Sequence, residues 1–388
     1  MNKLPIMLIM PVALLGLGGC GVFGGGDDTV EQPAELTAFD SSLRVRRVWS
    51  TRIGSATERL RLGLRPATDG TRIYAGAHDG SVESLDAETG RSQWSVETEL
   101  PLSSGPGFGA GVLVFGTNDG ELLALDATNG EERWRVAVGS EVLAPPAVTP
   151  NVVVFRSVDG RLRGVSSEDG SPIWSVEQSL PALTLRGNTA PYIAGSIVIS
   201  GFSNGRVGAY DLSSGERLWE LQVANPAGRN ELERLVDVSA GLQVVGNDVY
   251  TVSYQGRALG IDLRNGIVIW QQEMSSYAGL GVDLNNVYVT SDVDAVVAID
   301  RQTGTQIWSQ EALRLRDVTA PTRYGQAVVV GDFEGYLHWL DPNDGRFLAR
   351  TRAASDRIIG APLVSGLNLY VQADDGSVAA FEVVNESG

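Results

Sequence analysis

The chain of 388 residues has little of several residue types that enzymes use. Cys20 is its single cysteine and Lys3 its single lysine. An internal disulfide is therefore excluded, as is a lysine nucleophile or a phosphate-binding lysine beyond residue 3. The two histidines are His78 and His338, and no spacing of carboxylates around them would complete a zinc site. We predict no catalytic residues, no metal and no cofactor, and we expect both histidines to serve surface or packing roles.

A long membrane-spanning run is also missing. The stretch from Leu4 to Leu17 is apolar, but it is short and is interrupted by proline and glycine. With Lys3 before it and small residues after it, this stretch predicts an export signal over residues 1–19. It ends in Leu17-Gly18-Gly19-Cys20, which resembles the lipobox of bacterial lipoproteins. That resemblance implies cleavage before Cys20 and lipidation of Cys20, whereas the alternative is an ordinary export signal with an incidental cysteine.

Residues 20–40 are predicted to form a lipidated, flexible tether. They contain Gly24-Gly25-Gly26-Asp27-Asp28, which is too polar and too flexible to bury a folded core. The residue after the cysteine is Gly21, and in lipoproteins of this class the absence of aspartate there favours the outer membrane. We expect the protein to be held at that membrane by its lipid and to face the periplasm.

Basic charge is scarce, and the formal net charge is −17. Removal of residues 1–19 would take away Lys3 and leave 29 basic against 47 acidic side chains. A surface of this sign repels the phosphate backbone of nucleic acids, so we expect no nucleic-acid partner.

What the chain has in quantity is an internal repeat. Seven of its eight tryptophans recur at intervals of 38 to 51 residues: Trp49, Trp94, Trp134, Trp174, Trp219, Trp270 and Trp308. The last six each follow a glycine by four residues, and five of those glycines follow an aspartate by four residues. A seventh copy, from Asp341 to Gly345, has Ala349 where the tryptophan is expected. We expect the aspartate and the glycine to form a turn and the tryptophan to pack against the next copy.

Each copy predicts four antiparallel strands. In one copy they cover residues 144–148, 152–155, 161–165 and 173–176, with a tight turn at Asp159-Gly160. A single sheet of this kind cannot bury both of its faces, so the copies are expected to stack radially as the blades of an all-β propeller.

The two ends of the chain predict how the ring closes. A last copy has its third strand from Val378 to Val383 but no fourth strand, and Val45 to Ser50 is an unassigned strand that carries Trp49. If these two strands pair, residues 41–384 form one eight-bladed propeller, followed by a tail at residues 385–388. A seven-bladed ring would leave one copy over, and an open solenoid would not explain the divided copy.

Two consecutive blade-to-blade connections are longer than the others, which predicts a partner-binding site. One contains Leu183, Leu185 and Arg186, and the next contains Asp237. In antiparallel blades such connections leave the ring on the same face, so these residues would form an apolar spot surrounded by charge. Alternatively, Leu183 and Leu185 lie on an inner strand and point into the core.

The repeat resembles that of pyrroloquinoline-quinone dehydrogenases, whose eight-bladed propellers use a vicinal disulfide, calcium and a catalytic aspartate. The single cysteine excludes that disulfide here. A quinoprotein-like dehydrogenase and a glycan-binding propeller remain the alternative functions.

The lipobox, the eight-bladed repeat, Leu183-Thr184-Leu185-Arg186-Gly187 and Gly335-Tyr336-Leu337-His338-Trp339 together resemble the BamB family. These are lipoprotein subunits of the β-barrel assembly machinery in the Gram-negative outer membrane. The resemblance implies a non-catalytic scaffold in the periplasm that binds periplasmic domains of BamA, the central barrel subunit. A further hypothesis is that the propeller guides unfolded barrel precursors by offering strand edges. The resemblance also implies that Leu183, Leu185, Arg186 and Asp237 form the contact. The family often has a second acid two residues after Asp237, where this chain has Ser239.

Overall fold

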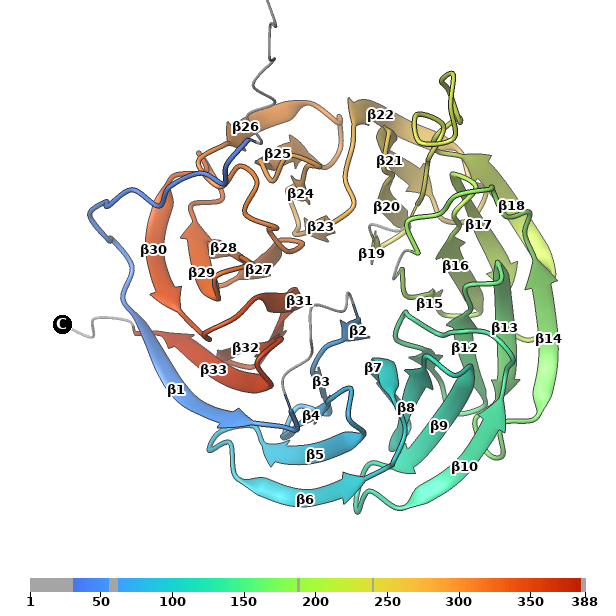
Figure 1. The fold of residues 1–388 in the computed structure, drawn as a ribbon. Coiled ribbons are helices and arrows are strands. Elements are labelled where there is room, and N and C mark those ends of the chain that lie inside the picture. The colour runs from blue at the N-terminus through green and yellow to red at the C-terminus, as the bar shows by residue number, and fades with distance from the viewer. Residues whose placement is uncertain (1–30, 56–61, 187–188, 239–240, 385–388) are drawn as a thin grey trace, which may run out of the picture. The chain divides into compact units, whose positions relative to one another are not determined.

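A computed structural model describes residues 31–55, 62–186, 189–238 and 241–384. Cys20, the predicted export signal and the tail at residues 385–388 lie outside these residues. In the described part every regular element is a β-strand, and no helix there is long and apolar enough to cross a membrane. The compact unit that begins at Pro33 is a ring of eight blades (Figure 1). The predicted eight-bladed, all-β propeller is confirmed.

Seven blades are made from consecutive strands. The first is β3 (Ala67–Thr68), β4 (Arg72–Gly76), β5 (Ser81–Asp86) and β6 (Ser92–Glu97). The second is β7 (Leu102–Gly109), β8 (Val112–Thr117), β9 (Glu121–Asp126) and β10 (Glu132–Ala137). The third is β11 (Ala147–Val148), β12 (Val152–Arg156), β13 (Arg161–Ser166) and β14 (Pro172–Glu177). The fourth is β15 (Tyr192–Ala194), β16 (Ile197–Gly201), β17 (Arg206–Asp211) and β18 (Arg217–Gln222).

The remaining blades follow the same plan. The fifth is β19 (Leu242–Val245), β20 (Asp248–Val252), β21 (Gly256–Asp262) and β22 (Val268–Met274). The sixth is β23 (Gly279–Val282), β24 (Asn286–Thr290), β25 (Val296–Asp300) and β26 (Gln306–Gln310). The seventh is β27 (Thr322–Tyr324), β28 (Ala327–Gly331), β29 (Tyr336–Leu340) and β30 (Phe347–Arg352). The second blade also gains a short parallel strand, β2 (Gly63–Leu64), beside β7, which the repeat did not predict.

The eighth blade joins the two ends of the chain, as predicted. Its inner strands are β31 (Ile358–Ser365), β32 (Asn368–Ala373) and β33 (Ser377–Val383), and its outer strand is β1 (Val45–Arg52). β1 runs antiparallel to β33, with Trp49 opposite Ala380 (Figure 1). Because the ring is closed by strand pairing, the N-terminal strand is part of the fold rather than an extension of it.

The periodic aspartates and glycines form the turns between third and fourth strands. In the first blade, the Asp86 carboxylate accepts a hydrogen bond from the Thr89 backbone N–H (2.8 Å). The Gly90 N–H donates to the Asp86 carbonyl (2.8 Å), and Gly90 has a φ of +70°. This left-handed conformation strains any residue with a Cβ atom, which explains the glycine at this point of the repeat.

The periodic tryptophans join neighbouring blades. Trp219 illustrates the contact, because its indole N–H donates to the Leu263 carbonyl of the next blade (2.7 Å). Its ring also lies against Gly266, where an added Cβ atom would approach the ring to 2.8 Å. The six other repeat tryptophans make the same bond to the second residue of the turn, which follows an aspartate in every case except Ser167, which follows Ser166: Trp49 to Ala87, Trp94 to Ala127, Trp134 to Ser167, Trp174 to Leu212, Trp270 to Arg301 and Trp308 to Pro342.

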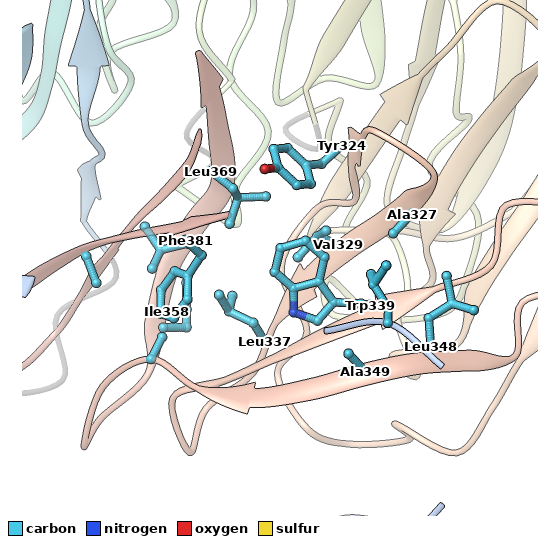
Figure 2. Packing of buried hydrophobic residues seen from close by; sticks show 14 of the residues in the cluster. Tyr324, Ala327, Val329, Leu337, Trp339, Leu348, Ala349, Ile358, Leu369 and Phe381 are labelled. Carbon is cyan, nitrogen blue, oxygen red and sulfur yellow. The ribbon is translucent and has the colours of Figure 1, made fainter. Parts of the chain in front are cut away.

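The seventh blade lacks this contact for a topological reason. The outer strand of the eighth blade is β1, from the other end of the chain, so β33 is not joined to its outer strand by an aspartate–glycine turn that could receive a tryptophan from position 349. Instead, Trp339 of β29 is fully buried between the two blades. It packs edge-on against Tyr324, with 5.5 Å between ring centroids, and lies in one cluster with Leu337 and Phe381 (Figure 2).

Residues 34–39, within the predicted tether, contact the propeller. The Ala34 N–H donates to the Arg314 carbonyl (2.9 Å), and Leu36 packs against the core between blades six and seven. Phe39 stacks on Phe347 of β30, with 5.4 Å between centroids. The compact unit therefore begins at Pro33, before the predicted start at residue 41, because this short segment carries apolar side chains that find a surface on the blades.

Candidate partner-binding site

The two long connections lie on one face of the wheel. The first joins β14 to β15, and the second joins β18 to β19. Because the strands of a blade alternate in direction, these connections share a face with the turns between second and third strands. Backbone hydrogen bonds connect them to those turns: the Gln178 N–H at the start of the first connection donates to the Gly160 carbonyl (3.1 Å), and the Val238 N–H of the second donates to the Phe202 carbonyl (3.2 Å).

The first connection presents the predicted residues outside any strand. Leu183 is 47% exposed, Leu185 is half-buried and Arg186 is exposed, with an ion pair to Glu141. The inner strand β15 begins only at Tyr192, so the alternative that Leu183 and Leu185 are core residues of an inner strand is wrong. Arg186 has a φ of +52°, a left-handed conformation that is uncommon for a residue with a side chain. The loop therefore turns sharply where it presents its charge.

Asp237, the predicted residue of the second connection, is buried, unlike Leu183 and Arg186 of the first. Its side chain is completely buried, and its backbone forms an antiparallel bridge with Tyr254, whose N–H donates to the Asp237 carbonyl (2.8 Å). The carboxylate therefore lies beneath the face and does not belong to the exposed rim around Leu183. In the same connection, Glu233 accepts hydrogen bonds from Arg229 and Asn230, which folds residues 229–233 into a compact turn.

Beneath the first connection lies a charged residue that the sequence analysis did not identify. Arg156 ends β12 and is 7% exposed. One of its amino groups, Nη2, donates to the Ser203 hydroxyl of the fourth blade (2.5 Å), and the guanidinium lies 5.8 Å from the centroid of the Phe202 ring. Burial lowers the pKa of Arg156, and the negative charge of Asp237 opposes this shift. Arg156 therefore lies under both connections and interacts electrostatically with the second.

A comparison of the blades shows how unusual Arg156 is. It pairs with Leu162 at the last register position of the second strand. The seven other blades have small or uncharged residues at that position: Gly76, Gly116, Gly201, Val252, Thr290, Gly331 and Gln372. Side chains here point at the next blade, since a Cβ atom on Gly201 would meet Val238. An arginine after the apolar run Val152–Phe155 was therefore a signal in the sequence, visible once the copies are aligned by their register.

The histidines take packing roles. His338 is completely buried, and its Nε2 lies 2.9 Å from the Asp332 carboxylate. Burial lowers the pKa of His338, although Asp332 opposes this shift, so the ring is neutral near pH 7. His78 contacts the Leu102 carbonyl through Nδ1 (2.8 Å). Within the described ranges, no cluster of three or more histidine, cysteine or acidic side chains could hold a metal ion.

Comparisons with known proteins connect this propeller to one family. The family model described as outer membrane protein assembly factor BamB matches residues 78–310 and 294–386. The BamB protein of Pseudomonas aeruginosa is 47% identical over 351 residues, which cover 90% of this chain and 92% of that protein. The Escherichia coli BamB protein is 32% identical over 388 residues, which cover 97% and 98% of the two chains.

Solved structures agree with this fold. BamB from Moraxella catarrhalis has a TM-score of 0.80 and 27% identity, covering 87% of this chain and all of that one. A quinohemoprotein alcohol dehydrogenase from Comamonas testosteroni has a TM-score of 0.71 at 13% identity, covering 87% of this chain and 76% of that chain. At that identity the dehydrogenase shares the architecture, and nothing about its chemistry follows for this chain.

Proposed function

This chain belongs to the BamB family of outer membrane protein assembly factors, and we propose that it is a non-catalytic scaffold of the β-barrel assembly complex. It binds periplasmic domains of BamA, the central barrel subunit, and thereby assists the folding and insertion of outer-membrane proteins. Lipidated Cys20 anchors it to the outer membrane, and the propeller faces the periplasm.

The observation that carries the proposal is the loop with Leu183 and Arg186. Large apolar side chains exposed on a loop beside a charge are a common composition of protein-binding sites. Leu183 is 47% exposed, whereas most apolar side chains of the blades are buried. The loop is supported by a rigid ring, so binding costs little ordering of the scaffold.

The proposed contact is tested by co-purification with BamA from detergent-solubilised envelopes. The variant L183A/L185A/R186A is expected to lose BamA while keeping the unfolding midpoint of the parent protein, because these side chains contribute little to the core. A matched control is L284A/L367A/R264A. Leu284 and Leu367 are 78% and 84% exposed in turns between first and second strands, on the opposite face, and Arg264 is an exposed, paired arginine on that face.

The control variant is expected to retain BamA. Undiminished co-purification of L183A/L185A/R186A would reject the site, and equal loss from both variants would show that the assay measures surface hydrophobicity in general. Two further measurements test the remaining parts of the proposal. C20S should release the protein from membranes, and reconstitution with quinone and calcium should give no dye reduction.

A further inference from the structure

The guanidinium of Arg156 is an incompletely satisfied buried cation. Its Nη1 is buried and has no hydrogen-bond partner in the part of the chain that the structure describes. Its Nη2 is bound to the neutral Ser203 hydroxyl, and the negative charge of Asp237 acts on the guanidinium without a hydrogen bond between the two among the described residues. A buried charge without a hydrogen-bonded counter-charge is costly, so such a group is normally completed by a ligand or by water.

Arg156 lines a small pocket that opens at the proposed partner-binding face. Its polar lining comes from Arg156, Ser157, Thr184, Arg186 and Ser203, and its apolar lining from Leu143, Ala144 and Val158. The pocket has a volume of about 10 Å³, which is the space of roughly one oxygen atom or one water molecule. Positive charge therefore lies on Arg156, at the base of the pocket, and a second guanidinium lies at its rim, on Arg186, which is ion-paired with Glu141.

We propose that this pocket is a receptor for one carboxylate, and that a docked aspartate or glutamate of the partner places an oxygen atom in it. Arg156 Nη1 donates to that oxygen from below, and the Arg186 guanidinium faces the second oxygen from the rim. A carboxylate fits these donors better than a neutral group, because a hydrogen bond between two charged groups is about twice as strong as a neutral one. The inference rests on the proposed docking of BamA at this face and identifies the chemistry of the contact.

The third blade differs from the seven others in having an arginine at position 156, and this difference supports the proposed carboxylate site. A structural arginine would be expected to have its donors satisfied by the fold, as Arg163 of the same blade does. Arg163 donates to the Val138 carbonyl (2.7 Å) and to the Asp159 carboxylate (2.7 Å). Arg156 instead replaces the small or neutral residue of the other blades. It keeps one buried amino group without a hydrogen-bond partner among the described residues, and it lines the pocket together with Thr184 and Arg186.

The test compares R156Q with R163Q in the full lipoprotein, measuring affinity for the purified periplasmic domains of BamA. R156Q is expected to weaken binding at least tenfold, and R163Q less than twofold. Thermal unfolding of both variants serves as the check on folding. If R156Q binds as tightly as the parent, the pocket holds only water and the inference is overturned.

A double-mutant cycle separates a direct contact from a structural effect. Each aspartate and glutamate of the BamA domains is changed to its amide and measured against the parent and R156Q. For one of these acids, the change to the amide is expected to weaken binding at least tenfold with the parent protein and less than twofold with R156Q. If the effects of R156Q and of the amide substitution on the binding free energy are additive at every acid, the inference is overturned. Failure of this inference can be distinguished from failure of the proposed function, because only in the second case does L183A/L185A/R186A bind BamA normally.

Discussion

Replacing Trp219 by phenylalanine tests how the blades are held together. Trp219 is 9% exposed and donates its indole N–H to the Leu263 carbonyl at 2.7 Å. Phenylalanine removes this hydrogen bond, which contributes about 1 kcal/mol, and leaves a gap where part of the ring was. The lost burial and the gap cost about 1–2 kcal/mol more, so we expect the free energy of unfolding to fall by about 2–3 kcal/mol.

The assay is urea unfolding followed by far-UV circular dichroism, which does not depend on the fluorescence of the altered tryptophan. The control is I267A, since Ile267 is 63% exposed and its loss should change the free energy of unfolding by less than about 0.5 kcal/mol. If W219F costs no more than I267A, the tryptophan does not hold the blades together, and our account of the repeat is wrong.

The same contact predicts non-additivity. Gly266 has a φ of +71°, and an added Cβ atom would meet the Trp219 ring at 2.8 Å. G266A should therefore lower the free energy of unfolding by about 1–2 kcal/mol because of the left-handed backbone, and by a further amount because of the clash with the ring. In a W219A background the contacts with the ring disappear and only the Cβ atom of residue 219, at 3.1 Å, stays close, so G266A should cost little more than the backbone part. Equal costs in both backgrounds would contradict the close packing of ring and glycine.

Three further predictions concern the closure, the docked N-terminal segment and pH. A chain that starts at Ser55 lacks β1 and leaves the edge of β33 unpaired, so it should aggregate on size-exclusion chromatography, whereas a chain that starts at Pro33 should remain monomeric and folded. L36S/F39S should speed limited proteolysis before β1 without changing the circular dichroism of the blades; unchanged cleavage would show that these contacts do not hold the segment. Because burial lowers the pKa of His338, the unfolded chain binds its proton more readily, and the free energy of unfolding should fall as pH drops below about 6.5. H338Q should flatten that slope in pH-dependent urea titrations, and an unchanged slope would assign it to other groups.

The sequence was sufficient for the architecture because the repeat is local. Most copies have a turn aspartate, a glycine and a tryptophan at fixed spacing, and these residues determine a turn and the position of an aromatic ring within a few residues. Ring closure could be predicted for the same reason, since β1 and β33 are the two halves of one copy. The extra strand β2 follows no repeat and was not predicted.

The site was only partly predictable. The length of two connections indicated which part of the ring could bind a partner, and Leu183 is exposed in the first of these connections. The burial of individual loop residues was not predictable. An acid such as Asp237 can lie at the surface or beneath it, depending on how its connection crosses the neighbouring turn. Arg156 was missed because it ends an apolar run, and its neighbours Phe202 and Ser203 belong to another blade.

The sequence by itself determined the number of blades, the strand that closes the ring and the residues that join one blade to the next, because these follow from spacing along the chain. Only the tertiary structure decided which charges are buried, which face the loop with Leu183 occupies and where residues 34–39 dock. Those properties arise from contacts between blades. Burial and electrostatic interaction depend on distances in space that no spacing in one copy specifies.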